Sequence, residues 1–161
     1  MVAFVTIKRD AMPADFDLET FLPYRMNRAS EAISRDFAQA YKRLYGMTRP
    51  EWRVLAALGQ LGRLTATQIG RHSAMHKTQV SRAVQRLEDR RWLTRATDDA
   101  DRRLEHLDLT RAGRAAYAEL SAHALRYQEQ LARELGSDAF AALQNGLTSV
   151  EREKKLTGNP R

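Results

Sequence analysis

The segment MHKTQVSRAVQRLEDRRWL, residues 75–93, combines a regular apolar stripe with a polar and basic opposite face. Val80, Val84 and Leu87 are four and three residues apart, a spacing that places them on the same side of an α-helix. At 100° per residue, the side chains that point away from this stripe or flank it are Thr78, Gln79, Ser81, Arg82, Gln85, Arg86 and Asp89. We therefore expect an amphipathic helix that buries one face and presents the other to a partner.

The polar face of this segment has the chemistry that recognises a nucleic acid. Arginine can bridge the two acceptors of guanine, glutamine can bridge adenine, and serine or threonine can contact a phosphate or a thymine methyl group. Lys77 lies near the expected helix start, where backbone N–H groups also favour a phosphate. Arg90 and Arg91 lie at the far end, where we expect them to favour the helix dipole or reach a phosphate rather than read bases. For this segment taken alone, a solvated basic surface helix is the alternative.

The charge of the whole chain favours an acidic partner. The 161 residues include 27 Lys and Arg against 20 Asp and Glu, a formal net charge of +7. Residues 71–103 hold nine Lys or Arg and five Asp or Glu, so a net charge of +4 falls in about a fifth of the chain. Nucleic acid is the first candidate partner on these grounds, and an anionic membrane surface is the second.

The segments around residues 75–93 carry the start and stop signals of a mainly helical chain. Helices are expected to begin near Leu22, at the capping boxes TRPE (48–51) and TATQ (65–68), after a break at Ser73-Ala74, at Thr110, and at Ser137 or Asp138. A polar loop at 97–102 separates two short extended pieces, the second alternating at Leu107 and Leu109, which indicates a β-hairpin. Three helices followed by a hairpin are typical of a winged helix-turn-helix. The predicted fold class is therefore mainly α with a small β-hairpin wing.

Residues 48–114 resemble the winged-helix core of MarR-type transcriptional regulators. Four matches carry the resemblance: the T-x-P-x-W-x-V-L beginning, the T-Q-V-S-R-x-V-x-R-L-E helix, the D-x-D-R-R wing loop and the L-T-x-x-G-R end. The similarity extends through the flanking helices, over about residues 20–155. Two positions depart from the pattern. His76 stands where relatives commonly carry Asp or Ser, which weakens the usual N-cap, and Ser73-Ala74 lacks the glycine that many relatives have in the turn.

The resemblance implies a homodimer whose terminal helices form the interface and whose recognition helices enter two successive major grooves of DNA. It divides a single domain, residues 1–161, into a DNA-binding lobe at 47–110 and a helical dimerisation region at 18–46 and 110–157. The sequence favours the same assembly, because its two long apolar stripes exceed what a small winged-helix lobe can cover.

The predicted DNA contacts come from the recognition helix and the wing. They are Lys77, Thr78, Gln79, Ser81, Arg82, Gln85, Arg86, Arg95, Arg102 and Arg103. The resemblance implies that wing arginines reach the minor groove and that an aspartate braces a neighbouring arginine. Here Asp99 or Asp101 could brace Arg102 or Arg103, and the sequence leaves these possibilities open.

The segment FLPYRMNR, residues 21–28, indicates a second kind of site. In MarR-type proteins, ligands bind between the dimerisation helices and the DNA-binding lobe. The L-P-Y-R beginning is similar to that of regulators of aromatic-acid degradation, some of which respond to hydroxycinnamoyl or related coenzyme A thioesters. An aromatic wall with arginines suits an aromatic carboxylate or a thioester phosphate. The candidate ligand residues are Tyr24, Arg25, Met26, Arg28, Trp52 and Arg53; alternatively, the aromatic residues belong to the core and the arginines form surface or dimer ion pairs.

Several other classes of protein are disfavoured. The chain has no cysteine, which excludes disulfides and thiolate metal sites, and no apolar run approaches the length of a membrane span. His72 and His76 have a zinc-compatible spacing, but a helix break is expected between them. Neither a phosphate loop nor a Ser/His/Asp arrangement with recognisable context occurs, so we expect no enzyme, no metal and no cofactor. The expected location is the cytoplasm.

These observations predict a homodimeric, sequence-specific DNA-binding regulator. We expect a repressor that binds a pseudo-palindromic operator and releases it when a small aromatic or anionic effector binds. Two alternatives remain: an architectural DNA-binding protein that needs no effector, and an enzyme or protein-interaction module that uses the same fold.

Overall fold

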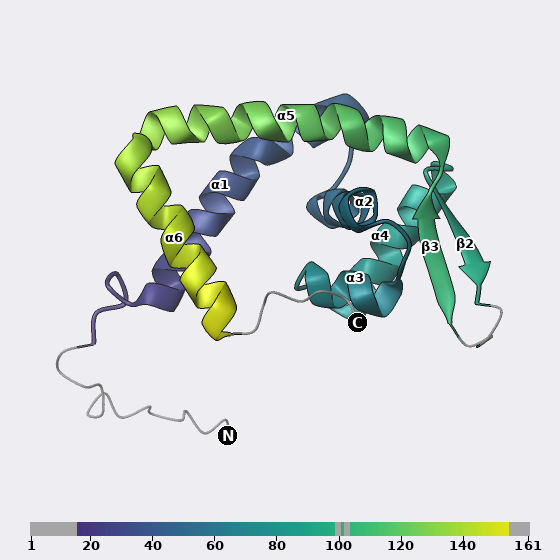
Figure 1. Cartoon of the computed structure of the whole chain (residues 1–161), viewed down its shortest axis with the longest axis horizontal. Helices are drawn as coiled ribbons and strands as arrows, with labels where there is room; N and C mark the ends of the chain where they lie inside the picture. The colour runs from purple at the N-terminus through teal and green to yellow at the C-terminus, as the bar shows by residue number, and fades with distance from the viewer. Residues whose placement is uncertain (1–15, 99–100, 102–103, 155–161) are drawn as a thin grey trace, which may run out of the picture. The chain divides into compact units, whose positions relative to one another are not determined.

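The computed structural model describes residues 16–98, 101 and 104–154, and these residues form helices α1–α6 and a small sheet (Figure 1). The chain divides into two compact units, Met1–Asp36 and Phe37–Arg161, and α1 (Leu22–Tyr45) belongs to both. In the first unit, the ring of Phe16 packs edge-on against that of Phe21 at 5.4 Å, and Arg28 forms an ion pair with Glu19 at 2.5 Å. The helix predicted from Leu22 to the residue before Gly46 is confirmed.

The three helices of the lobe begin at the capping signals in the sequence. They are α2 (Arg49–Leu61), α3 (Ala66–His72) and α4 (Lys77–Asp89). The Glu51 carboxylate accepts the Thr48 N–H at 3.3 Å at the start of α2. At the start of α3, Thr65 and Gln68 each accept the other's backbone N–H, at 3.3 and 2.8 Å. Both predicted capping boxes are therefore found at the N-termini of α2 and α3, where they stabilise the helices.

The predicted hairpin is present and belongs to a three-stranded antiparallel sheet. Its strands are β1 (Leu64–Thr65), β2 (Leu93–Thr97) and β3 (Glu105–Leu109), in the order β1-β3-β2. Leu93 pairs with Leu109, and Leu64 pairs with Leu107, so leucines from all three strands face the lobe core. The sequence did not predict β1, because two residues are too few to show strand alternation.

A single apolar core holds α2, α3, α4 and the sheet together beneath the N-terminal half of α5 (Arg111–Leu135) (Figure 1). Leu55, Ile69 and Leu87 are fully buried at its centre. Val80 and Val84 are 1% and 2% exposed, which confirms the predicted inward stripe of α4. The polar face of α4 is consequently fixed in orientation by the packing of its apolar face.

Two glycines allow helices to approach this core closely. A Cβ on Gly113, in the first turn of α5, would lie 2.0 Å from the Trp92 carbonyl oxygen. A Cβ on Gly59 of α2 would lie 2.4 Å from the ring of Tyr117 on α5. The glycine in the L-T-x-x-G-R motif is therefore required where α5 leaves the wing.

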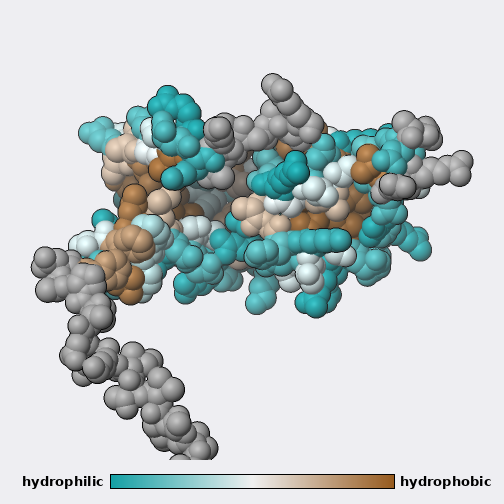
Figure 2. All heavy atoms as spheres, turned by 90° about the horizontal axis from the view of Figure 1, so that it is seen from below, coloured by the Kyte–Doolittle hydropathy of each residue, from teal (hydrophilic) through white to brown (hydrophobic). Residues whose placement is uncertain are grey.

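The last helix differs from the lobe in its burial. Helix α6 (Ser137–Glu153) turns away from α5 after Gly136 (Figure 1), and none of its residues is buried. Large apolar side chains remain exposed along α5 and α6 at Leu125, Leu135, Leu143 and Leu147. Figure 2 shows hydrophobic side chains that reach the surface on both sides of the view. Within the described residues, no helix is both long and apolar enough to cross a membrane.

Candidate nucleic-acid interface and adjoining cavity

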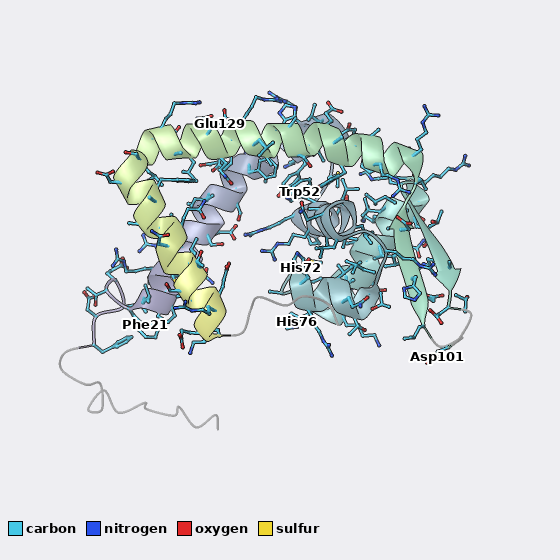
Figure 3. The ribbon with its side chains drawn as sticks, in the orientation of Figure 1. Phe21, Trp52, His72, His76, Asp101 and Glu129 are labelled. Carbon is cyan, nitrogen blue, oxygen red and sulfur yellow. The ribbon has the colours of Figure 1, made fainter. Side chains whose placement is uncertain are left out.

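Helix α4 presents an exposed face made of the side chains predicted to contact DNA. The seven predicted helix residues are all exposed: Lys77, Thr78, Gln79, Ser81, Arg82, Gln85 and Arg86. Gln85 donates a hydrogen bond to Asp89 at 2.9 Å, whereas Arg82 has no ion pair among the described residues. His76 at the start of α4 and Asp101 in the hairpin loop both lie at the lower side of the lobe in Figure 3. The start of α4 and the wing therefore face the same way.

The start of α4 lacks a capping side chain, as its sequence suggested. His76 occupies the N-cap position, but its imidazole makes no capping hydrogen bond. The Gln79 side chain compensates in part by accepting the His76 N–H at 3.2 Å. Among the described residues, the amide nitrogen of Gln79 has no hydrogen-bond partner, and it lies on the exposed face of α4.

The turn between α3 and α4 closes without a glycine, as the sequence Ser73-Ala74 indicates. Ala74 takes the left-handed conformation there, with φ of 48°. The Met75 N–H donates to the Gly70 carbonyl at 3.0 Å, and a Cβ on Gly70 would lie 3.2 Å from the Met75 oxygen. Ala74 therefore adopts, without being a glycine, a backbone conformation that costs about 1–2 kcal/mol for L-residues.

A buried carboxylate ties α4 to the beginning of the lobe. Glu51 is 2% exposed, and its oxygens lie 3.8 Å from Arg86 Nε and 3.7 Å from Arg90 Nη2. Arg90 also donates to the Tyr45 carbonyl at 2.8 Å, at the end of α1. The sequence identified Glu51 as a capping residue but not as an ion-pair partner, because its cationic partners are far away along the chain.

Arg90 makes contacts that the sequence did not indicate. Its expected action on the dipole of α4 or on a phosphate stays a prediction. In the structure its guanidinium donates to the carbonyls of Tyr45 and Gly46 at the end of α1 and lies over the Trp92 ring at 5.4 Å. Its donors are directed to the protein because α4 ends beside the C-terminus of α1, which is a tertiary contact that helical periodicity does not reveal.

Arg95 fastens the wing to the recognition helix. Its Nε lies 3.0 Å from Glu88 Oε2, and its Nη1 lies 3.1 Å from Glu105 Oε2. Desolvation lowers the pKa of Arg95, but the hydrogen bonds to Glu88 and Glu105 outweigh it and raise the pKa above its ordinary value. The guanidinium of Arg95 is therefore partly committed to orienting β2 against α4, and its contact with DNA stays a prediction.

The wing contains a second pair that the sequence did not indicate. His106 Nε2 lies 2.8 Å from Asp98 Oδ2, and the other oxygen of Asp98 accepts the Asp101 N–H at 3.0 Å. These contacts hold the two ends of the hairpin loop. The predicted bracing partners Asp99, Arg102 and Arg103 lie outside the described residues.

A cavity of about 720 Å³ opens beside the helix-turn-helix, between α2, the end of α3 and α5. The predicted ligand residues Trp52 and Arg53 line it, together with His72, Tyr117 and Gln128. Figure 3 shows Trp52 on α2 and His72 on α3 on the same side of the lobe. Trp52 also packs against Phe37 and Tyr41, so it belongs both to the core and to the cavity wall.

The other four predicted ligand residues, Tyr24, Arg25, Met26 and Arg28, lie in the first unit. Arg28 lies over the ring of Tyr24 at 5.5 Å. Their participation in a ligand site stays a prediction. In the described part of the chain, no group of three or more His, Asp or Glu side chains could hold a metal ion.

Comparison with known proteins identifies the lobe. Residues 45–104 match the model of the MarR family. The chain is 30% identical to a MarR family transcriptional regulator from Silicibacter pomeroyi DSS-3, whose crystal structure superposes with a TM-score of 0.70 over 84% of this chain and 99% of the other. The chain belongs to the MarR family. It is thus a DNA-binding transcriptional regulator with a winged-helix fold.

A curated relative and two solved structures with the same fold are more distant in sequence. The uncharacterized HTH-type transcriptional regulator YwoH of Bacillus subtilis is 26% identical over 125 residues, 76% of this chain and 90% of YwoH. The structure of NadR in complex with 4-hydroxyphenylacetate shares the fold, with 20% identity and a TM-score of 0.71 over 86% of this chain and 97% of NadR. Bordetella bronchiseptica BpsR, whose DNA binding is regulated by 6-hydroxynicotinic acid, has 23% identity and a TM-score of 0.74 over 84% of this chain and 96% of BpsR.

Proposed function

We propose that this MarR family protein is a homodimeric repressor that reads a pseudo-palindromic operator with helix α4. The observation that carries the proposal is the two-sided construction of α4. Val80, Val84 and Leu87 are at most 2% exposed, while the opposite face presents donors and acceptors suited to base edges and phosphates. A recognition helix needs a fixed orientation, which the packing of its apolar face provides. The ion pairs of Glu51 with Arg90 and of Arg95 with Glu88 also hold α4 in place.

The proposed contacts divide by chemistry. Arg82, Gln85 and Gln79 are suited to base edges, and Lys77, Thr78, Ser81 and Arg86 to phosphates or base edges near the groove walls. From the wing, Arg95, Arg102 and Arg103 are proposed to reach the neighbouring backbone or minor groove. Arg86 remains 71% exposed despite its proximity to Glu51, so its guanidinium can still meet DNA.

The proposed dimer uses the helices outside the lobe. Helix α6 has no buried residue, although Phe140, Leu143, Leu147 and Val150 form a stripe spaced by three and four residues. An apolar stripe of this length is costly to leave in water, and a second copy of the chain offers the matching surface. We propose residues 47–110 as the DNA-binding lobe and residues 18–46 and 110–157 as the dimerisation region.

The proposed effector is a small aromatic carboxylate or its coenzyme A thioester. The cavity beside Trp52 and Arg53 has a volume typical of small-molecule sites and combines aromatic walls with a cation. Two proteins that share the fold support this class of effector, since NadR was solved in complex with 4-hydroxyphenylacetate and the DNA binding of BpsR is regulated by 6-hydroxynicotinic acid. Release of DNA would follow if the ligand prefers a dimer whose recognition helices are not about 34 Å apart, the spacing of successive grooves.

Selection of binding sites from random duplexes tests the proposal. We expect enrichment of a sequence with two inverted half-sites centred about one helical turn apart. Affinity for the selected duplex should fall when an aromatic carboxylate is added. Binding without enrichment of any sequence would instead support the architectural alternative, since phosphate contacts alone carry no sequence information.

A further inference from the structure

Arg53 joins the cavity to the turn of the helix-turn-helix. Its Nη1 donates to the Ser73 carbonyl at 3.1 Å, across 20 residues of sequence. Ser73 is the C-cap residue of α3, so its carbonyl lies at the beginning of the turn that leads to α4. Arg53, Ser73 and Ala74 all line the cavity. A ligand in the cavity therefore meets both the donor and the segment that the donor holds.

The turn that Arg53 holds is closed by backbone hydrogen bonds from Ser73 to Ile69 and from Met75 to Gly70, but it also contains a strained residue. Ala74 is in the left-handed region with φ of 48°, a conformation that L-residues adopt at a cost. The next residues lead to His76, whose side chain makes no capping hydrogen bond at the start of α4. The hydrogen bond from Arg53 thus adds a side-chain contact to a segment that contains a left-handed residue and leads to a helix start without a side-chain cap.

The electrostatic surroundings of Arg53 favour an incoming anion. Within the described residues, Arg53 forms no ion pair with a carboxylate, and none of the residues that line the cavity is acidic. Burial, followed by the nearby positive charge of Arg49, lowers the pKa of the Arg53 guanidinium. A carboxylate can accept a charge-assisted hydrogen bond from guanidinium, which is stronger than the bond to a neutral carbonyl.

We propose that Arg53 is the positioning residue that couples the cavity to the recognition helix. In the free protein it holds the Ser73 carbonyl and keeps the turn closed. A carboxylate in the cavity takes over the guanidinium, the Ser73 carbonyl is released, and the turn that sets the start of α4 loosens. This inference rests on the proposed function, because it assumes an anionic ligand in the cavity, and it assigns the residue through which that ligand acts.

Amide hydrogen exchange of the turn tests the coupling directly. The Ser73 and Met75 N–H groups donate to Ile69 and Gly70 carbonyls at 2.9 and 3.0 Å, so their protection reports whether the turn is closed. In Arg53→Ala without ligand, we expect these amides to exchange roughly three- to tenfold faster, as the loss of one net hydrogen bond predicts. Arg63→Ala, which removes an exposed arginine outside the cavity, is the matched control and should leave both rates unchanged.

The ligand arm uses 4-hydroxyphenylacetate and its neutral amide as probes. The carboxylate should speed exchange at Ser73 and Met75 in the wild type and weaken binding to the selected operator, and the amide should do neither. In Arg53→Ala, the carboxylate should cause no further change in exchange. Arg53→Lys keeps the charge but loses the planar donor, so it should bind the carboxylate while leaving the turn partly loosened.

The outcomes separate this inference from the proposed function. If the wild type binds the carboxylate but Arg53→Ala leaves the exchange of the turn unchanged, the inference is overturned and the effector proposal stands. If the carboxylate perturbs neither the stability nor the exchange of the wild type, both the coupling and the effector proposal are overturned, while operator reading by α4 is unaffected. A melting transition measured for each variant confirms that the comparison is between folded proteins.

Discussion

The winged-helix lobe and helix α6 differ in how far their apolar residues are buried. In the lobe, leucines such as Leu55, Leu58 and Leu87 are at most 1% exposed, and helices and strands from several parts of the sequence close over them. In α6, Leu143 and Leu147 are 42% and 38% exposed, and no residue of the helix is buried. The lobe is stabilised by its own core, whereas α6 carries an apolar face that only another surface can cover.

The difference indicates how stability and assembly are divided in the chain. A substitution in the lobe core should change the free energy of unfolding of each protomer. A substitution on the α6 stripe should act mainly on association, if a second copy covers it.

The largest effect is expected from a cavity in the lobe. Leu87→Ala removes a side chain with 0% exposure between α4 and the rest of the core, and should lower the free energy of unfolding by about 2–5 kcal/mol. Urea unfolding followed by circular dichroism measures this. Leu104→Ala, in the wing at a position 45% exposed, is the matched control, and an equal loss there would contradict the contrast in burial.

The second effect concerns assembly. The double variant Leu143→Asp with Leu147→Asp places charges on the α6 stripe of both protomers, and each lost leucine contact is worth about 1.5–3 kcal/mol when fully buried. We expect a dimer to become a monomer in sedimentation equilibrium, with the circular dichroism of the lobe retained. A dimer that survives both substitutions would show that α6 is not part of the interface.

Replacement of glycine by alanine should lower the stability of the protein at Gly113 and raise it at Gly146. Gly113→Ala forces a Cβ to within 2.0 Å of the Trp92 carbonyl, so the start of α5 must shift, at a cost of about 1–3 kcal/mol. Gly146→Ala, in the middle of α6 with no atom within 4 Å of the new Cβ, should stabilise by about 0.5–1 kcal/mol through helix propensity. Thermal unfolding compares the two, and destabilisation by Gly146→Ala would place a partner surface against that residue.

The smallest effect is expected at the end of α4. Arg91 has φ of 59°, and its N–H donates to the Glu88 carbonyl at 2.7 Å while Trp92 donates to Leu87 at 2.9 Å, the pattern of a helix C-terminus that glycine normally completes. Arg91→Gly and Arg91→Ala remove the same charge, but only glycine relieves the left-handed conformation. Arg91→Gly should be about 1 kcal/mol more stable than Arg91→Ala in the same urea experiment. Equal stabilities would show that the backbone at this position is not strained.

The order of elements was accessible from the sequence because its signals are local. Capping boxes, helical periodicity and strand alternation depend on residues within a few positions of one another, and each predicted helix and the hairpin are found. The two-residue strand β1 was missed because it exists only through pairing with β3. Local patterns carry no information about such a partner.

The sequence predicted which residues of the site are exposed, but not the long-range ion pairs and hydrogen bonds that surround them. The outward face of α4 follows from its periodicity, and Trp52 and Arg53 were placed in a ligand site on their chemistry and the family resemblance. The ion pairs of Glu51 with Arg90 and of Arg95 with Glu88, and the hydrogen bond from Arg53 to Ser73, join residues that the fold alone brings together. These contacts hold Arg53, Arg90 and Arg95 against other parts of the protein.

Reading of base sequence by α4 can be measured by comparing its affinities for two duplexes. The ratio of affinities for the selected operator and for random DNA should be measured in the wild type, in Arg82→Ala, and in Arg111→Ala as an exposed, charge-matched control. We predict that Arg82→Ala reduces discrimination by about 1–3 kcal/mol, whereas Arg111→Ala leaves the ratio unchanged. An Arg82→Ala variant that weakens both duplexes equally would contradict base reading by this helix face.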